Sequence, residues 1–82
     1  MLQLKIVSPE NVVYDGPVES VLVPGMLGQF EILNDHAPII STLVKGYVEY
    51  ATGSGEKTRL DILGGFVEVK KNEVSLCVEV NE

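Results

Sequence analysis

The segment Gly64–Val78, GGFVEVKKNEVSLCV, decides the fold. Apolar and polar residues alternate on both sides of Lys71-Asn72, with the period of two that is typical of half-buried β-strands. If Lys71-Asn72 is the tip of a β-hairpin, one register gives an apolar face and also sets Lys70 opposite Glu73 on the other face. That register pairs Val69 with Val74, Val67 with Leu76, Gly65 with Val78, Phe66 with Cys77, and Glu68 with Ser75.

A second predicted hairpin precedes this one, with its turn at Thr52–Glu56, TGSGE. Two registers keep the apolar residues of its strands on a common face. We favour the register that places Glu49 opposite Arg59, because the other places Glu49 opposite Asp61, a like-charge pair. Gly64-Gly65 then allows the chain to turn sharply into the final hairpin.

The N-terminal third also predicts strands. Residues 2–6 alternate between apolar and polar, and a run from 12 to 23 follows, which Pro24-Gly25 is expected to end. Asp15-Gly16-Pro17 interrupts this run and predicts a bend or bulge at Gly16. No stretch keeps a helical apolar period for more than one turn, so we expect no substantial helix.

The predicted fold is therefore all-β: a single domain, residues 1–82, forming a flattened two-sheet β-sandwich or barrel of about eight to ten short strands. The start of the chain, MLQLKIVSPE, has no features of a targeting signal. The apolar runs are far too short for direct insertion into lipid.

The net charge argues against two classes of binding partner, and the cysteine content rules out a disulfide within the chain. Twelve acidic residues against six basic ones give a net charge of −6, which disfavours nucleic acid and anionic membrane surfaces. Cys77 is the single cysteine and therefore has no disulfide partner within the chain.

The inventory of chemical groups predicts no catalytic, cofactor-binding or metal-binding residues. His36 and Cys77 are the only residues of their kinds, and a nucleophilic Cys-His pair has no local support in the sequence. A zinc site lacks ligands, and Gly25–Gly28 lacks the further residues of a phosphate-binding loop. The acidic residues are expected on solvated strand faces.

The stretch Pro24–Pro38, PGMLGQFEILNDHAP, is the densest in unusual features. Met26 and Leu27 form an apolar loop tip, which either contacts a partner or folds back over its own sandwich. Phe30 and Leu33 are expected to contribute to the core.

The same stretch resembles the epsilon subunit of the bacterial F-type ATP synthase, whose mitochondrial counterpart is called delta. The shared pattern is P-G-x-x-G-x-F-x-x-L-x-x-H-A-P over Pro24–Pro38, followed by Leu43-x-x-Gly46. Tyr14–Val21, YDGPVESV, and Gly64–Val69, GGFVEV, also resemble segments of that family. The resemblance implies a flattened, ten-stranded β-sandwich at the cytoplasmic face of the bacterial inner membrane, attached peripherally through the synthase.

The resemblance also implies a function. The chain would be a non-catalytic rotor (central-stalk) subunit that binds the gamma subunit and the polar loops of the c-ring, and it would couple proton translocation to ATP synthesis. The residues implied for the c-ring contact are Met26, Leu27, Gly28, Gln29 and Phe30, with His36 at the same end. Those implied for gamma are Ile39, Ile40, Ser41 and Thr42.

Two features depart from the family pattern. Leu27 and Gln29 stand where members often carry acidic residues, so this loop is more apolar. The sequence stops at Val78–Glu82, on the expected last strand, without the C-terminal helical hairpin of most members. The expectation is therefore no helix-mediated inhibition of ATP hydrolysis and no ATP site.

Two alternatives remain open at this point. A biotinyl- or lipoyl-type carrier domain is also a small acidic β-sandwich with a lysine at a hairpin tip, as Lys71 is here, but Lys70 and Asn72 are not the flanking residues that such domains carry. The other alternative is an acidic β-sandwich interaction module without a rotor role.

Overall fold

The computed structural model describes residues 1–80, which form nine β-strands. The strands are β1 (Leu2–Val7), β2 (Val12–Val18), β3 (Ser20–Gly25), β4 (Gly28–Ile32), β5 (Ile39–Leu43), β6 (Gly46–Ala51), β7 (Lys57–Ile62), β8 (Gly64–Lys70) and β9 (Glu73–Glu79). In this part of the chain all regular structure is strand, which confirms the predicted fold class, and no helix could cross a membrane. Nine strands are one fewer than the resemblance implies. The expected end of the last strand, residues 81–82, lies outside the described residues.

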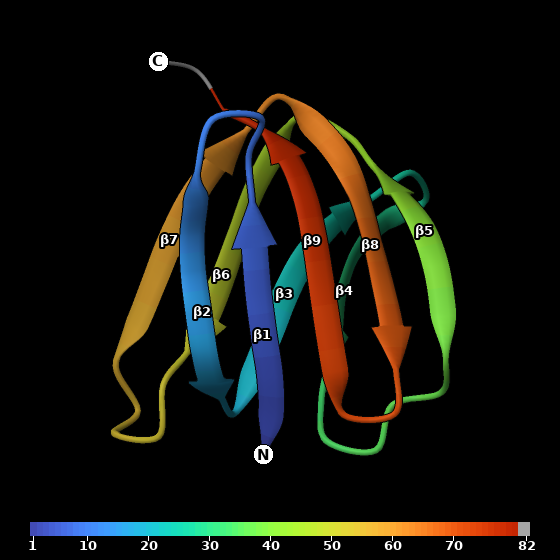
Figure 1. Cartoon of the computed structure of the whole chain (residues 1–82). Coiled ribbons are helices and arrows are strands. Elements are labelled where there is room, and N and C mark those ends of the chain that lie inside the picture. Colours follow the sequence, from blue (N-terminus) through green and yellow to red (C-terminus); the bar gives the residue numbers. More distant parts are fainter. Residues whose placement is uncertain (81–82) are drawn as a thin grey trace.

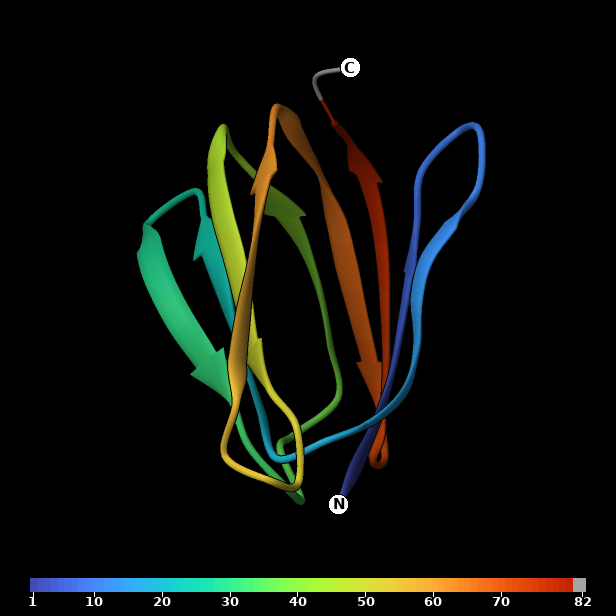
Figure 2. The same ribbon diagram turned by 90° about the vertical axis from the view of Figure 1, so that its left-hand side faces the viewer.

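One sheet curls on itself to form two layers (Figure 1). The strand order is β2-β1-β9-β8-β5-β3-β6-β7, and β4 pairs with β3 off this path. Figure 2 shows the layers edge-on, with β2, β1, β9 and β8 on one side and β4, β3, β6 and β7 on the other. β5 joins the layers, because it pairs along its length with β8 and reaches β3 through Leu43 and Gly25.

The predicted registers of both C-terminal hairpins are confirmed. β8 and β9 pair Val69 with Val74, and Lys70 with Glu73, on either side of a two-residue turn. β6 and β7 place Glu49 opposite Arg59, the favoured alternative. Both registers follow from the rule that each face of a strand repeats every second residue.

β1 pairs in parallel with β9, which no local pattern in the sequence indicated. Gln3 faces Glu73 and Val7 faces Cys77, and the Gln3 amide donates to the carbonyl of Asn72 at 2.8 Å. A parallel pair joins strands that lie far apart in the sequence, so no turn announces it. This pairing closes the N-terminal β1–β2 hairpin onto the C-terminal one.

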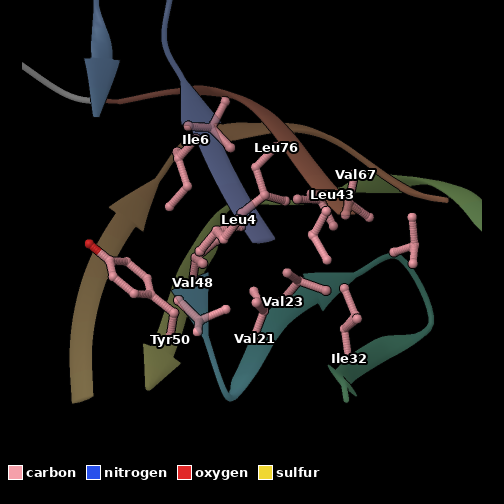
Figure 3. Close-up of a cluster of buried hydrophobic side chains, with 14 of the residues drawn as sticks. Leu4, Ile6, Val21, Val23, Ile32, Leu43, Val48, Tyr50, Val67 and Leu76 are labelled. Atoms are coloured by element: carbon pink, nitrogen blue, oxygen red, sulfur yellow. The ribbon is translucent and has the colours of Figure 1, made fainter. Parts of the chain in front are cut away.

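The core lies between the two layers (Figure 3). The core consists of the side chains that point inward, which lie at every second position of the strands. They include Leu4, Ile6, Val21, Val23, Ile32, Leu43, Val48, Tyr50, Val67 and Leu76. The Tyr14 ring packs on the Tyr50 ring with centroids 4.6 Å apart, which closes the core near β2 and β6. Leu33, expected in the core, is instead half-exposed after the end of β4, and Phe30 is only partly buried.

The expected bulge at Gly16 is wrong. β2 runs through Gly16, which faces Leu4, and the register shift lies three residues earlier in this strand, where Val13 is an extra residue between the partners of Ile6 and Val7. A Cβ atom at position 16 would lie 3.0 Å from the Tyr14 hydroxyl, which donates to the carbonyl of Pro17 at 3.0 Å. Glycine is thus needed for the Tyr14 side chain to fold over the strand. The expected end of the second run is close to the observed one, since Pro24-Gly25 are the last two residues of β3.

Replacing Leu76 with Ala should destabilise the fold by about 2–5 kcal/mol, because the fully buried leucine would leave a cavity between the layers. Urea denaturation measures the free energy of unfolding. The matched control is Ser75→Ala on the exposed face of the same strand, which should change it by no more than about 0.5 kcal/mol. Equal effects of the two changes would contradict the register of β9.

Candidate partner-binding site

The turn between β3 and β4 carries two exposed apolar side chains, Met26 and Leu27, here called the tip. Gly25 faces Gly28 across it, and Gly28 has φ of 126°, a conformation that favours glycine. Leu27 has a relative exposure of 105% and Met26 of 69%. The tip therefore projects into solvent, and the alternative that it folds back over its own sandwich is wrong.

A shallow apolar hollow lies beside the tip, lined by Gly25, Met26, Leu27, Gly28, Phe30 and Ser41. Phe30 reaches it from the inner face of β4, and Ser41 comes from β5 in the adjoining part of the curled sheet. The structure thus brings together residues that the sequence assigned to two different partners. One continuous flank of the molecule, between β4 and β5, contains both sets.

A polar cluster lies on the outer face beside the β3–β4 hairpin. The guanidinium carbon of Arg59 in β7 lies 3.6 Å from the ring centroid of Tyr47 in β6, a cation–π contact. Hydrogen bonds from the side chains of Gln29 and Arg59 hold the pKa of the Tyr47 hydroxyl below its ordinary value of 10.0. Gln29 belongs to β4, so the cluster connects three strands next to the tip. Sequence reasoning missed it, because β3 separates β4 from β6 and only the sheet order places these residues together.

His36 does not lie at the end of the molecule that carries the tip, and this expectation is wrong. β4 runs away from the tip for five residues, about 17 Å at about 3.4 Å per residue. The following loop then meets the β8–β9 turn, where the Asp35 amide donates to the side-chain oxygen of Asn72 at 2.8 Å (Figure 1). His36 Nδ1 lies 2.7 Å from the carbonyl oxygen of Ala37. His36 therefore stabilises its own loop, at the opposite end of the sandwich.

The residues expected to contact gamma, Ile39 to Thr42, form most of β5 and do not share one face. Ile39 and Ser41 are half-buried and face inward, whereas Ile40 and Thr42 face outward. Ile40 is 75% exposed. Of the four, Ile40 offers the largest apolar contact to a partner.

An apolar row continues from Thr42 across the outer face of the neighbouring strands. Thr42 faces Phe66, Phe66 faces Cys77, and Cys77 faces Val7. Phe66 is 48% exposed, although the outer face of a two-layer protein is usually polar. We call Ile40 together with this row the outer patch. The alternating pattern of β8 put Phe66 on this face, but its alignment with β1 and β5 required the structure.

The structure separates His36 from Cys77. His36 lies beside the β8–β9 turn, while Cys77 lies five residues along β9 from Asn72, about 17 Å away. No three His, Cys, Asp or Glu side chains in this part of the chain could hold a metal ion. Lys71 is exposed at the hairpin tip, with φ of 59°.

Comparison with known proteins identifies the family. Residues 1–82 match the family described as ATP synthase, delta/epsilon chain, β-sandwich domain. The chain belongs to this family. It is 42% identical over 78 residues to the ATP synthase epsilon chain of Leptospira interrogans, covering 95% of this chain and 61% of that protein. It is 36% identical over 81 residues to the ATP synthase epsilon chain of a Cyanothece strain, covering 99% and 58%.

Solved structures share the delta/epsilon fold. A chain of the Euglena gracilis mitochondrial ATP synthase, in an assembly of OSCP, F1 and the c-ring, superposes with a TM-score of 0.89 at 22% identity, covering 94% of this chain and 49% of that chain. A chain of the Tetrahymena thermophila mitochondrial ATP synthase central stalk and c-ring gives 0.82 at 16%, covering 95% and 63%. The present chain therefore spans about three fifths of the length of the epsilon chains cited, which it covers to 61% and 58%. Family membership favours the epsilon-subunit interpretation over the carrier-domain one.

Replacing Arg59 with Gln should raise the pKa of Tyr47 back toward 10.0, because one hydrogen bond and the nearby positive charge are lost. Residue-resolved NMR titration of the Tyr47 ring measures this pKa. Because the pKa of Tyr47 is lower in the folded chain than in the unfolded one, the free energy of unfolding rises as the pH increases through this pKa toward 10.0. The Arg59→Gln variant should lose this gain in stability. Lys57→Gln, on the same strand, is the control, and an unchanged Tyr47 pKa in Arg59→Gln would contradict the cluster.

Proposed function

We propose that this chain is a non-catalytic rotor component of a bacterial F-type ATP synthase, located at the cytoplasmic face of the inner membrane. Relatives named ATP synthase epsilon chain support this proposal, as do fold relatives in assemblies that contain the c-ring. The observation that carries it is the exposed apolar tip, Met26 and Leu27, on a member of this family. Burial against a partner would remove this apolar surface from water.

Two surfaces divide the contacts in this proposal. The tip and its neighbours as far as Phe30 bind the polar loops of the c-ring. Because this loop carries Leu27 and Gln29 in place of acids, the contact depends on apolar burial more than on ion pairs. The outer patch around Ile40 and Phe66 binds gamma. His36 has no role in the c-ring contact, since it lies at the other end of the sandwich.

Rigidity is the proposed mechanism of coupling. Nine short strands joined by continuous backbone ladders resist shearing, so rotation of the c-ring would be passed to gamma with little deformation of the linking domain. The Gln29–Tyr47–Arg59 cluster adds stiffness next to the tip, where β4 has only one neighbouring strand within residues 1–80.

The proposal is tested by adding the tagged chain to detergent-solubilised bacterial membranes and identifying the proteins recovered with it by mass spectrometry. Recovery of gamma with the c-ring supports the rotor role. If the folded chain recovered neither gamma nor the c-ring, the rotor role would be contradicted. The alternative interpretation, an acidic β-sandwich interaction module with another partner, would then hold.

Replacing both Met26 and Leu27 with Asp should leave the melting temperature unchanged and weaken binding to the purified c-ring by roughly tenfold or more, because both side chains are exposed in the free chain. Light scattering or surface plasmon resonance measures the affinity. The matched control replaces Val12 and Val13 on β2, which are also exposed, with Asp. Loss of folding in the tip variant, or equal affinity, would contradict the assignment.

Replacing Ile40 with Asp should weaken binding to isolated gamma by roughly tenfold while binding to the c-ring is retained, because the residue belongs to the outer patch and not to the tip. Thr42→Asp, with a smaller side chain in the same strand, should have less effect. If Ile40→Asp weakened only c-ring binding, the two surfaces would be assigned the wrong way round.

A further inference from the structure

Three strands pair with a single neighbouring strand within residues 1–80. β2 and β7 end the strand order, and β4 pairs only with β3. A free edge presents unpaired backbone N–H and C=O groups that can bind another strand. β2 carries Pro17, and β7 carries outward charges at Lys57, Arg59 and Asp61, both of which discourage pairing. β4 has no proline, and Glu31 is its one charged residue.

The backbone of Pro24 shows which groups of β4 are free. The Pro24 carbonyl accepts a hydrogen bond from the Val44 amide at 2.9 Å, so it points away from β4. In an antiparallel ladder, residue pairs that exchange hydrogen bonds alternate with pairs that do not. Pro24 faces Gln29, and because the Pro24 carbonyl points away from β4, this is a pair without hydrogen bonds. Gln29 and, two residues on, Glu31 therefore direct their N–H and C=O groups to the free edge.

The side chains beside this edge favour a particular kind of partner. Phe30, between Gln29 and Glu31, points to the inner face and lines the apolar hollow at the tip. On the outer face, Glu31 has Leu22 as its neighbour on β3, and beyond Leu22 lies Glu49, which faces Arg59, so Glu31 is the acidic residue at the free edge. The position next to Glu31 on the free edge thus suits a cation, in a chain of net charge −6.

We propose that the free edge of β4 is a docking edge for an extended segment of a partner protein in the rotor. The segment adds as a strand along Gly28–Ile32 and bonds to the backbone of Gln29 and Glu31. It places an apolar side chain in the hollow beside Phe30 and a basic side chain opposite Glu31. This inference rests on the proposed function, because it takes the partner from the rotor.

Hydrogen–deuterium exchange tests this, with the chain alone compared with the chain bound to a purified complex of gamma and the c-ring. The Gln29 and Glu31 amides should exchange roughly tenfold or more slowly in the complex. The amides of β7, at another free edge, should exchange at the same rate in both states.

A pair of variants separates the backbone contribution from the charge. Glu31→Pro removes the edge N–H together with the carboxylate, whereas Glu31→Ala removes only the carboxylate. Since the Glu31 N–H points away from β3, the ladder between β3 and β4 keeps its bonds in both variants. Glu31→Pro should bind the complex roughly fivefold to tenfold more weakly than Glu31→Ala. Circular dichroism checks the fold of each, and if Glu31→Pro unfolds, the exchange measurement decides.

The possible outcomes separate the two proposals. Binding with slowed exchange at Gln29 and Glu31 supports the docking edge. Binding without such protection, or equal affinities of the two folded variants, overturns the docking edge and leaves the rotor role intact. Failure of the folded wild-type chain to bind the complex overturns both.

Discussion

The register of the β8–β9 hairpin is the constraint on which the rest of the structure depends. It sends Val67, Val69, Val74 and Leu76 into the core. A slip of one residue between the two strands would turn the two core residues of one strand to solvent and its polar residues inward, so burial fixes the register strongly. The two outer edges of this hairpin then bind β1 and β5. β1 and β5, and through β1 also β2, thus take their positions from a single hairpin.

The candidate binding surfaces follow from this arrangement. β5 remains paired with β8 and meets β3 only at Leu43 and Gly25, so the flank between β4 and β5 is left open. The β3–β4 hairpin stands at this flank, held on one side by β3, with Tyr47 and Arg59 beside it. The apolar tip projects from the end of this hairpin and is exposed. The feature proposed to bind a partner is therefore a consequence of how the sheet curls.

The functional residues were predictable where they depend on local pattern. The apolar pair Met26-Leu27 between Gly25 and Gly28 indicated a projecting turn, and the structure has it. His36 was placed at the wrong end because it lies near the tip in sequence, while β4 carries the chain across the whole sandwich in between. The cluster of Gln29, Tyr47 and Arg59 could not be predicted, since its members come from strands whose order in the sheet has no local signal.

The sequence by itself determined the all-β class, the turns, and the registers of the two C-terminal hairpins. Each of these depends on residues within about ten positions of one another, where alternation, glycine and cross-strand charge act directly. Only the tertiary structure decided the parallel pairing of β1 with β9, the passage of β5 between layers, and the open edge of β4. These depend on which apolar faces of distant strands bury each other best. Burial has no direction along the chain, so no local pattern encodes it.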